Sequence, residues 1–150
     1  MGKRLLKLNL GCADKRLPGF ENLDAPWRME HGLDYEDGTI DAITVSHMFL
    51  YIPAAAWPAA FAELYRVLKP GGIVRITEDN TEDPASERYG GWHDAVTLTG
   101  PKAVRAALRE AGFVARRMSA EQSLYRDLSL LQQWHGEEPK VMFMEGAKPK

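Results

Sequence analysis

Three apolar stretches of this sequence each end in residues that could take part in chemistry. The first begins at Leu5 and ends at Gly11, and the carboxylate of Asp24 follows further along the chain. A buried strand that ends in glycine offers backbone amides at its carboxyl end, and a carboxylate beside them can accept hydrogen bonds from ribose hydroxyls. The pattern predicts a nucleoside-binding site, although the glycines of the fuller G-x-G-x-x-G motif are missing. On these residues alone, Gly11 could equally turn a strand and Asp24 could cap a turn.

The other two stretches are rich in β-branched residues, which predicts buried strands. Asp41 to Ser46 reads DAITVS and precedes His47, and Ile73 to Thr77 reads IVRIT and precedes Glu78 and Asp79. An imidazole titrates near neutral pH, so His47 could act as a general base; a half-buried histidine with internal partners is the alternative interpretation. The histidines of the chain lack the spacing of a metal site, so we expect no metal.

A long polar segment, residues 81–98, follows the third stretch and contains Tyr89, Trp92 and His93. Loops longer than about 12 to 15 residues are usually functional or disordered. The three side chains could therefore contact a substrate, or they could anchor the loop to the rest of the protein.

The surrounding pattern predicts the elements that must hold these residues. Alternating apolar runs predict strands, apolar side chains at helical spacing predict amphipathic helices, and Gly and Pro mark the ends. We expect strands at 5–10, 20–23, 41–46, 73–77, 113–118 and 141–147, helices at 55–68 and from the N-cap Thr99 to Gly112, a short helical turn at 13–17 and a short helix around 124–134. The first two strands are too close for a full crossover helix, which normally needs a dozen or more residues. This order predicts an α/β fold: a mostly parallel sheet with an antiparallel C-terminal edge strand, abbreviated in its first half.

Length and composition indicate what kind of protein this is. The chain has 150 residues, of which 45% are hydrophobic and 27% are charged, so we expect one domain over residues 1–150 with a core of its own. The longest apolar stretch, residues 43–56, is interrupted by polar residues and proline and is too short to cross a membrane. The N-terminus does not have the apolar region of a signal peptide, and a single cysteine fits a reducing compartment. We therefore expect a cytoplasmic protein.

The charge of the chain argues against one class of partner. The formal net charge is −2, whereas strong non-specific binding of nucleic acid needs a clustered basic surface. The basic residues that do gather are Arg105, Arg109, Arg116 and Arg117. Their spacing fits a solvated helix face and strand edge better than a nucleic-acid site.

Together, these motifs resemble the small class I, Rossmann-like, S-adenosylmethionine-dependent methyltransferases, of the type 11-like kind. The resemblance spans about residues 5–148. ELYRVLKPGGIVRIT, residues 63–77, is its most specific part, and it matches the family's helix, Leu-Lys-Pro-Gly-Gly turn and following strand. LNLGCA resembles the family's first motif, and NLD, which ends at Asp24, resembles its second acidic strand end.

The resemblance implies a function and a set of site residues. S-adenosylmethionine would be the cofactor and S-adenosylhomocysteine the product, and the methyl would pass to a small molecule or sugar by direct displacement. The implied cofactor-binding residues are Asn9, Gly11, Cys12, Ala13, Asp24, Asp34, Tyr35, Ser46 and His47, with His47 the one candidate for a catalytic role. The implied substrate contacts are Tyr51, Glu78, Asp79, Tyr89, Trp92 and His93. For Asp34, a solvated loop carboxylate is the competing interpretation.

Three features of the chain depart from the family pattern. Ala13 stands at the family's second glycine, Leu50-Tyr51 stands where many relatives have Glu-His, and the region between Asp24 and Asp41 is short. An added methyl at position 13 lies where backbone and cofactor approach closely. A second hypothesis therefore stands beside the enzyme: a binding module or partner subunit that kept the fold without catalysis, with weak or no affinity for the cofactor. The partner of the chain could be another protein or a second copy of itself. A dinucleotide oxidoreductase fits less well, because the pyrophosphate turn lacks its glycines.

Overall fold

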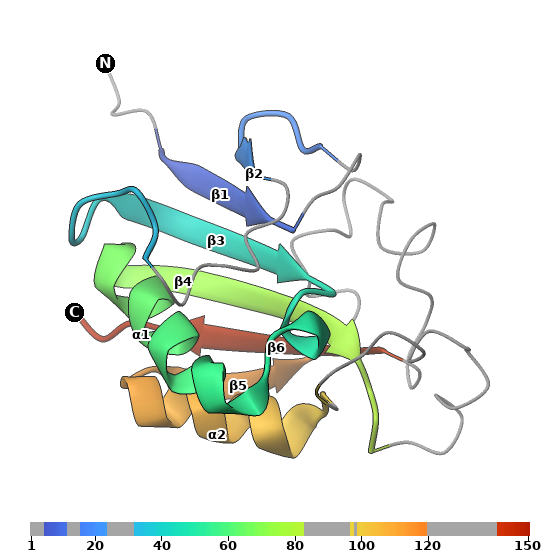
Figure 1. Ribbon diagram of the computed structural model, residues 1–150. Helices are drawn as coiled ribbons and strands as arrows, with labels where there is room; N and C mark the ends of the chain where they lie inside the picture. Colours follow the sequence, from blue (N-terminus) through green and yellow to red (C-terminus); the bar gives the residue numbers. More distant parts are fainter. Residues whose placement is uncertain (1–4, 12–15, 24–31, 83–96, 98, 120–140) are drawn as a thin grey trace.

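The computed structural model describes residues 5–11, 16–23, 32–82, 97, 99–119 and 141–150, and within them one six-stranded sheet (Figure 1). Its strands, in the order β2-β1-β3-β4-β6-β5, are β1 Lys7–Leu10, β2 Glu21–Leu23, β3 Ile40–Ser46, β4 Leu68–Asp79, β5 Val114–Met118 and β6 Val141–Ala147. The helices are α1 Trp57–Val67 and α2 Pro101–Ala111, with the short 3₁₀ turns η2 Phe49–Tyr51 and η3 Ala54–Ala56 before α1.

Strand direction confirms the predicted fold class. Strands β2, β1, β3 and β4 are parallel, and β6 runs antiparallel to both of its neighbours. The C-terminal strand lies one place inside the edge, between β4 and β5, because it pairs along its whole length with β4 and also with β5. The first half is abbreviated as predicted: the described residues before β2 and β3, 16–20 and 32–39, contain no helix.

Both helices cover the same face of the sheet (Figure 1). Helix α1 buries Trp57, Phe61 and Leu64 along one stripe, and α2 buries Val104 and Leu108. These side chains meet the alternate apolar residues of the central strands in one core, in which the Phe49 and Phe61 rings stack with centroids 4.4 Å apart. No helix in the described part of the chain is long and apolar enough to cross a membrane.

Both ends of helix α2, which Pro101 and Gly112 indicate in the sequence, lie close to their predicted positions. Helix α2 ends at Gly112, which has a φ of +110°, the left-handed conformation that favours glycine. Its N-cap is Gly100 and not Thr99, because the Thr99 hydroxyl donates to the backbone oxygen of Asp79 and ties the helix start to β4. Strand β4 begins five residues earlier than predicted: Leu68 pairs with Ile40, and a bulge then shifts the register before Ile73 pairs with Ala42.

The opposite face of the sheet carries a continuous polar row. Side chains alternate between the two faces of a strand, so the neighbours of the buried apolar residues point away from the helices. Register places one such residue from every strand side by side, in the order Asn22, Asn9, Thr44, Arg75, Glu145 and Arg116. The Glu145 carboxylate accepts hydrogen bonds from Arg75 at 2.9 Å and from Arg116 at 3.1 Å, which joins β4, β6 and β5.

Candidate functional site

The candidate site lies at the carboxyl edge, by which we mean the ends of β1, β3 and β4. The chain runs from β1 to β2 on one side and returns to β3 on the other, so the strand order reverses between β1 and β3. Open α/β sheets bind ligands in the crevice outside such a reversal. Gly11 follows β1 at this point, and its N–H donates to the oxygen of Leu23 at the end of β2.

Gly11 could not be replaced by a larger residue without strain. Its φ of +74° is a conformation that L side chains rarely adopt. A Cβ at this position would lie 3.3 Å from the Ser46 carbonyl oxygen and 3.4 Å from Met48 Cβ. The glycine therefore lets the end of β1 pack closely against the end of β3, at the point where the strand order reverses.

The turn after β3 has a strained backbone. His47 has a φ of +48° and is the one non-glycine residue with positive φ in the described ranges. Its N–H donates to the Thr77 oxygen at 2.8 Å, so β4 holds the turn in place. Non-glycine residues in this region of φ persist only where the surrounding structure enforces them, and they cluster at functional sites. Ser46, the residue before it, is buried.

The His47 side chain lies beside Asp79, and its Nδ1 is 3.6 Å from the Asp79 carboxylate. Burial lowers the pKa of His47 to about 4 and raises the pKa of Asp79. The imidazole is therefore neutral at pH 7. It can donate or accept a hydrogen bond at the carboxyl edge, but it is a weak general base.

Glu78 lies next to Asp79 at the end of β4 but on the opposite face of that strand, beside the 3₁₀ turn η2. It is fully buried, and its Oε2 accepts hydrogen bonds from the backbone N–H groups of Met48 at 2.8 Å and Phe49 at 3.0 Å. Burial raises the pKa of Glu78 to about 8, against the opposing effect of these amides. The side chain is thus engaged with the backbone of the turn.

Asn9 is buried in the polar row and joins the first two strands. Its amide Nδ2 donates to Asn22 Oδ1 at 2.8 Å, and Asn22 in turn bonds the backbone of Leu17 and Phe20. These bonds fix the end of β2 beside β1. Sequence analysis did not identify Asn22 as a site residue. A polar residue in the middle of a short predicted strand, close to Asp24, could have indicated it.

The loop that contains Asp34 and Tyr35 lies away from the carboxyl edge. Residues 32–39 lead into the start of β3, at the end of that strand opposite its arrowhead in Figure 1. Asp34 is exposed. The Tyr35 hydroxyl donates to Glu21, whose strand partner is Leu8, and burial together with Glu21 raises the pKa of Tyr35 to about 12.

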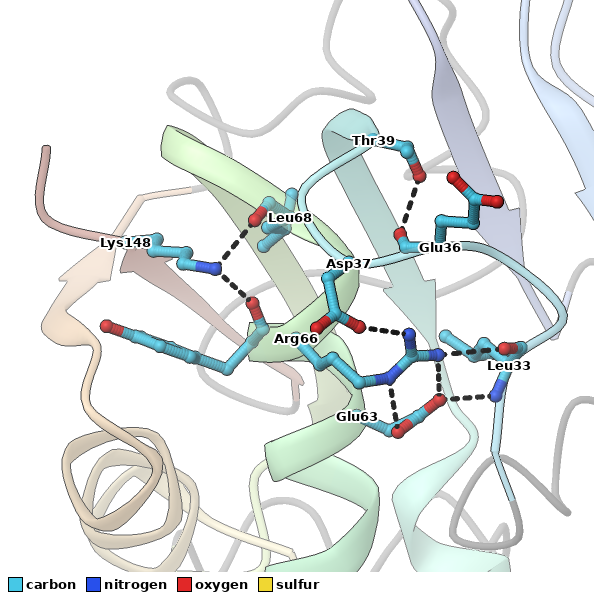
Figure 2. A network of polar contacts seen from close by, with 9 residues as sticks. Leu33, Glu36, Asp37, Thr39, Glu63, Arg66, Leu68 and Lys148 are labelled. Carbon is cyan, nitrogen blue, oxygen red and sulfur yellow. Dashed lines mark hydrogen bonds and ion pairs between the residues drawn. The ribbon is translucent and has the colours of Figure 1, made fainter.

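A polar network fastens this loop to α1, as Figure 2 shows. The Arg66 guanidinium donates to Asp37 at 2.7 Å, to the Leu33 oxygen at 2.9 Å and to Glu63. Glu63 also accepts the Leu33 N–H at 2.7 Å. Nearby, Lys148 Nζ donates to the backbone oxygens of Tyr65 and Leu68 at the end of α1, both at 2.8 Å.

The remaining predicted site residues fall into two groups. Tyr51 is 51% exposed on η2, which leaves its ring open to solvent at the carboxyl edge. The others lie outside the described residues, namely Cys12, Ala13, Asp24, Tyr89, Trp92 and His93. Within the part of the chain that the structure describes, no three metal-ligating side chains come together.

Comparison with known proteins agrees with this geometry. Residues 13–76 match the family model described as a methyltransferase domain. This segment of the chain is similar to a methyltransferase domain. A search of curated protein sequences found no match. The predicted resemblance to the S-adenosylmethionine-dependent methyltransferases is confirmed by the family match over residues 13–76, and the solved structures share the fold.

Three such structures show the extent of the likeness. An S-adenosylmethionine-dependent methyltransferase of Archaeoglobus fulgidus superimposes with a TM-score of 0.68 at 10% identity, over 96% of this chain and 86% of that one. A chain from the Haloferax volcanii complex of the Trm112 methyltransferase activator with a proposed methyltransferase gives 0.66 at 15% identity, over 100% and 84%. The phosphoethanolamine N-methyltransferase 2 of Haemonchus contortus, in complex with S-adenosyl-L-methionine, gives 0.60 at 14% identity, and this chain spans 50% of its length. At these identities the likeness is one of fold.

Proposed function

We propose that this protein binds S-adenosylmethionine at the carboxyl edge and transfers its methyl group to a small-molecule or sugar-type acceptor. The observation that carries the proposal is the Gly11 turn at the β1/β3 reversal. Its positive φ favours glycine, and the turn lies at the reversal of strand order, outside which open α/β sheets bind their ligands. The family match over residues 13–76 supports the same cofactor.

Within this proposal, each residue of the site has a defined task. Gly11, Cys12 and Ala13 line the amino-acid part of the cofactor, and Asp24 accepts the ribose hydroxyls. Asn9 acts indirectly, because its side chain is bonded to Asn22 and holds β2 beside β1. Asp34 and Tyr35 are not included, because their loop is fastened to α1 at the other end of the sheet.

Methyl transfer from a sulfonium needs orientation more than covalent help. The cofactor supplies an activated methyl, and the protein aligns the acceptor with it. Orientation of this kind can lower the activation barrier by about 7–11 kcal/mol. Ser46 and His47 lie at the strand end nearest the proposed methyl position. A neutral His47 can orient an acceptor hydroxyl or amine by a hydrogen bond, and Tyr51 on η2 offers an exposed ring.

Calorimetric titration with S-adenosylmethionine and S-adenosylhomocysteine tests the cofactor. We expect saturable heat for both ligands and weaker binding for Asp24→Ala. Absence of heat at millimolar ligand, or the same affinity in Asp24→Ala, would contradict the proposal. Formation of S-adenosylhomocysteine, followed across panels of amines, phenols and sugars, then tests turnover and identifies the acceptor.

A binding module or partner subunit without catalysis is the second candidate. It is supported by Ala13 and Leu50-Tyr51, which depart from the family pattern, and by the Haloferax volcanii neighbour, which was solved with an activator protein. This candidate predicts weak or no cofactor binding and no turnover, and a mass larger than one chain in light scattering when a partner is present. The cytoplasmic location and the single-domain organisation expected from the sequence remain predictions.

A further inference from the structure

We propose that Glu78 is a positioning residue for cofactor binding, which acts by holding Met48 against the Gly11 turn. The inference rests on the proposed function and deepens it. It also changes the role that sequence resemblance implied for Glu78, from a substrate contact to a support of the cofactor site.

The first step is the bond between Glu78 and the turn after β3. Oε2 of Glu78 accepts the N–H groups of both Met48 and Phe49, which lie 30 and 29 residues away in the sequence. The side chain is 0% exposed. A buried backbone N–H that loses its acceptor is costly, so these bonds fix the place of the turn relative to β4.

The second step is the contact between that turn and Gly11. Both flanks of the turn approach the glycine: the Ser46 oxygen lies 3.3 Å and Met48 Cβ 3.4 Å from the position of a Gly11 Cβ. The strained His47 lies between them and is itself bonded to Thr77. A turn that stores strain relaxes when its supports are removed, so loss of the Glu78 bonds should move Met48 relative to Gly11.

The placement of the Glu78 side chain argues against direct contact with substrate. Alternation along β4 puts Glu78 on the same face as Val74 and Ile76, which the helices cover, whereas Asp79 and Thr77 point to the opposite face. Both hydrogen bonds use one oxygen as an acceptor. That task does not require a negative charge, so an amide at this position can perform it.

Amide hydrogen exchange of the wild-type protein gives the first test. Because binding and the turn are coupled, saturation with S-adenosylhomocysteine should slow exchange at Met48 and Phe49 by about tenfold or more. The control amides are those of Gly71, which donates to the Lys148 oxygen, and of Lys148, which donates to the Gly72 oxygen, at the opposite end of the sheet. Their exchange should change by less than about twofold. Unchanged exchange at Met48 and Phe49 in a protein that binds the ligand would overturn the inference.

Three variants give the second test, with the dissociation constant of S-adenosylhomocysteine as the readout. Glu78→Gln keeps an acceptor oxygen and should bind within about threefold of wild type, whereas Glu78→Ala should bind about tenfold more weakly or worse. Lys148→Met is the matched control, because it also removes two hydrogen bonds from a side chain to the backbone, at the end of α1. It should lower stability and leave the dissociation constant unchanged.

The outcomes separate this inference from the proposed function. Equal affinity in Glu78→Ala and Lys148→Met would overturn the role of Glu78, and so would equal loss in Glu78→Gln and Glu78→Ala. Should Glu78→Ala fail to fold, the exchange measurement on the wild-type protein decides the question. A wild-type protein that binds neither S-adenosylmethionine nor S-adenosylhomocysteine would instead contradict the proposed function itself.

Discussion

Met48 lies over the position that a side chain on Gly11 would occupy at the carboxyl edge: a Cβ on Gly11 would lie 3.4 Å from Met48 Cβ. The two residues join the β1 turn to the β3 turn where the strand order reverses. The first prediction follows from this contact.

Gly11→Ala should destabilise the protein by about 1–2 kcal/mol, because an L side chain at φ +74° is strained, and should weaken S-adenosylhomocysteine binding. Gly38→Ala is the control, since Gly38 also has positive φ, +63°, but has nothing within 4 Å of its Cβ position. Urea unfolding should show a loss for both variants, and calorimetry should show weaker binding for Gly11→Ala alone. Wild-type affinity in Gly11→Ala would separate this turn from the cofactor.

Arg66→Met should lower the free energy of unfolding by about 1–2 kcal/mol, because it removes the donor shared by Asp37, Glu63 and the Leu33 oxygen. The Arg66 side chain is 33% exposed, so solvent screens part of the ionic contribution. Arg109→Met, an exposed arginine in the last turn of α2, should change stability by less than about 0.5 kcal/mol. Equal effects in urea unfolding would show that the network in Figure 2 does not stabilise the loop.

Stability should fall as the pH rises from 6.5 to 8. Burial raises the pKa of Glu78 from 4.5 to about 8, so in this range the folded protein keeps a proton that the unfolded chain has lost. The resulting stabilisation is complete below pH 4.5 and is lost as the pH rises through 8. His47 acts in the opposite direction, because its pKa is lowered from 6.5 to about 4; its slope is about half a proton at pH 6.5 and falls to about a tenth of a proton at pH 7.5.

Urea unfolding between pH 6.5 and 8 measures this slope, which for one proton is at most about 1.4 kcal/mol per pH unit. Glu78→Gln should abolish it. Asp79→Asn is the control for the neighbouring carboxyl, whose pKa burial also raises. A slope that survives in Glu78→Gln and disappears in Asp79→Asn would assign the titration to Asp79.

Gly146→Ala should destabilise the packing of α2 on β6 by about 1–3 kcal/mol. A Cβ at Gly146 would lie 2.7 Å from Leu108 Cδ2 and 3.1 Å from Phe113 Cγ. Because the clash is with these side chains, Leu108→Ala should make room for the added methyl. In a double-mutant cycle, the pair should therefore cost less than the sum of the single changes, and additive losses would count against this explanation.

Several elements of the fold could be predicted because their signals are local. The apolar spacing of Trp57, Phe61 and Leu64 predicted α1, and Gly112 predicted the end of α2, since a left-handed residue needs no distant partner. The β-branched runs before His47 and Glu78 predicted β3 and β4, and the order of elements predicted a mostly parallel sheet.

Other features depend on partners far along the chain, and only the tertiary structure decided them. The early start of β4 is set by the pairing of Leu68 with Ile40, and the start of α2 by the bond from Thr99 to Asp79. Sequence patterns report the period and the chemistry of neighbouring residues, but they do not report which backbone group a side chain meets across the fold.

The candidate site shows the same division. From the sequence alone, Gly11, Ser46, His47, Glu78 and Asp79 could be assigned to the ends of apolar stretches, because parallel strands bring their carboxyl ends to one edge. Their separate tasks could not be assigned. Glu78 and Asp79 are adjacent carboxylates in the sequence, yet strand alternation places one on the amides of Met48 and Phe49 and the other beside the His47 imidazole.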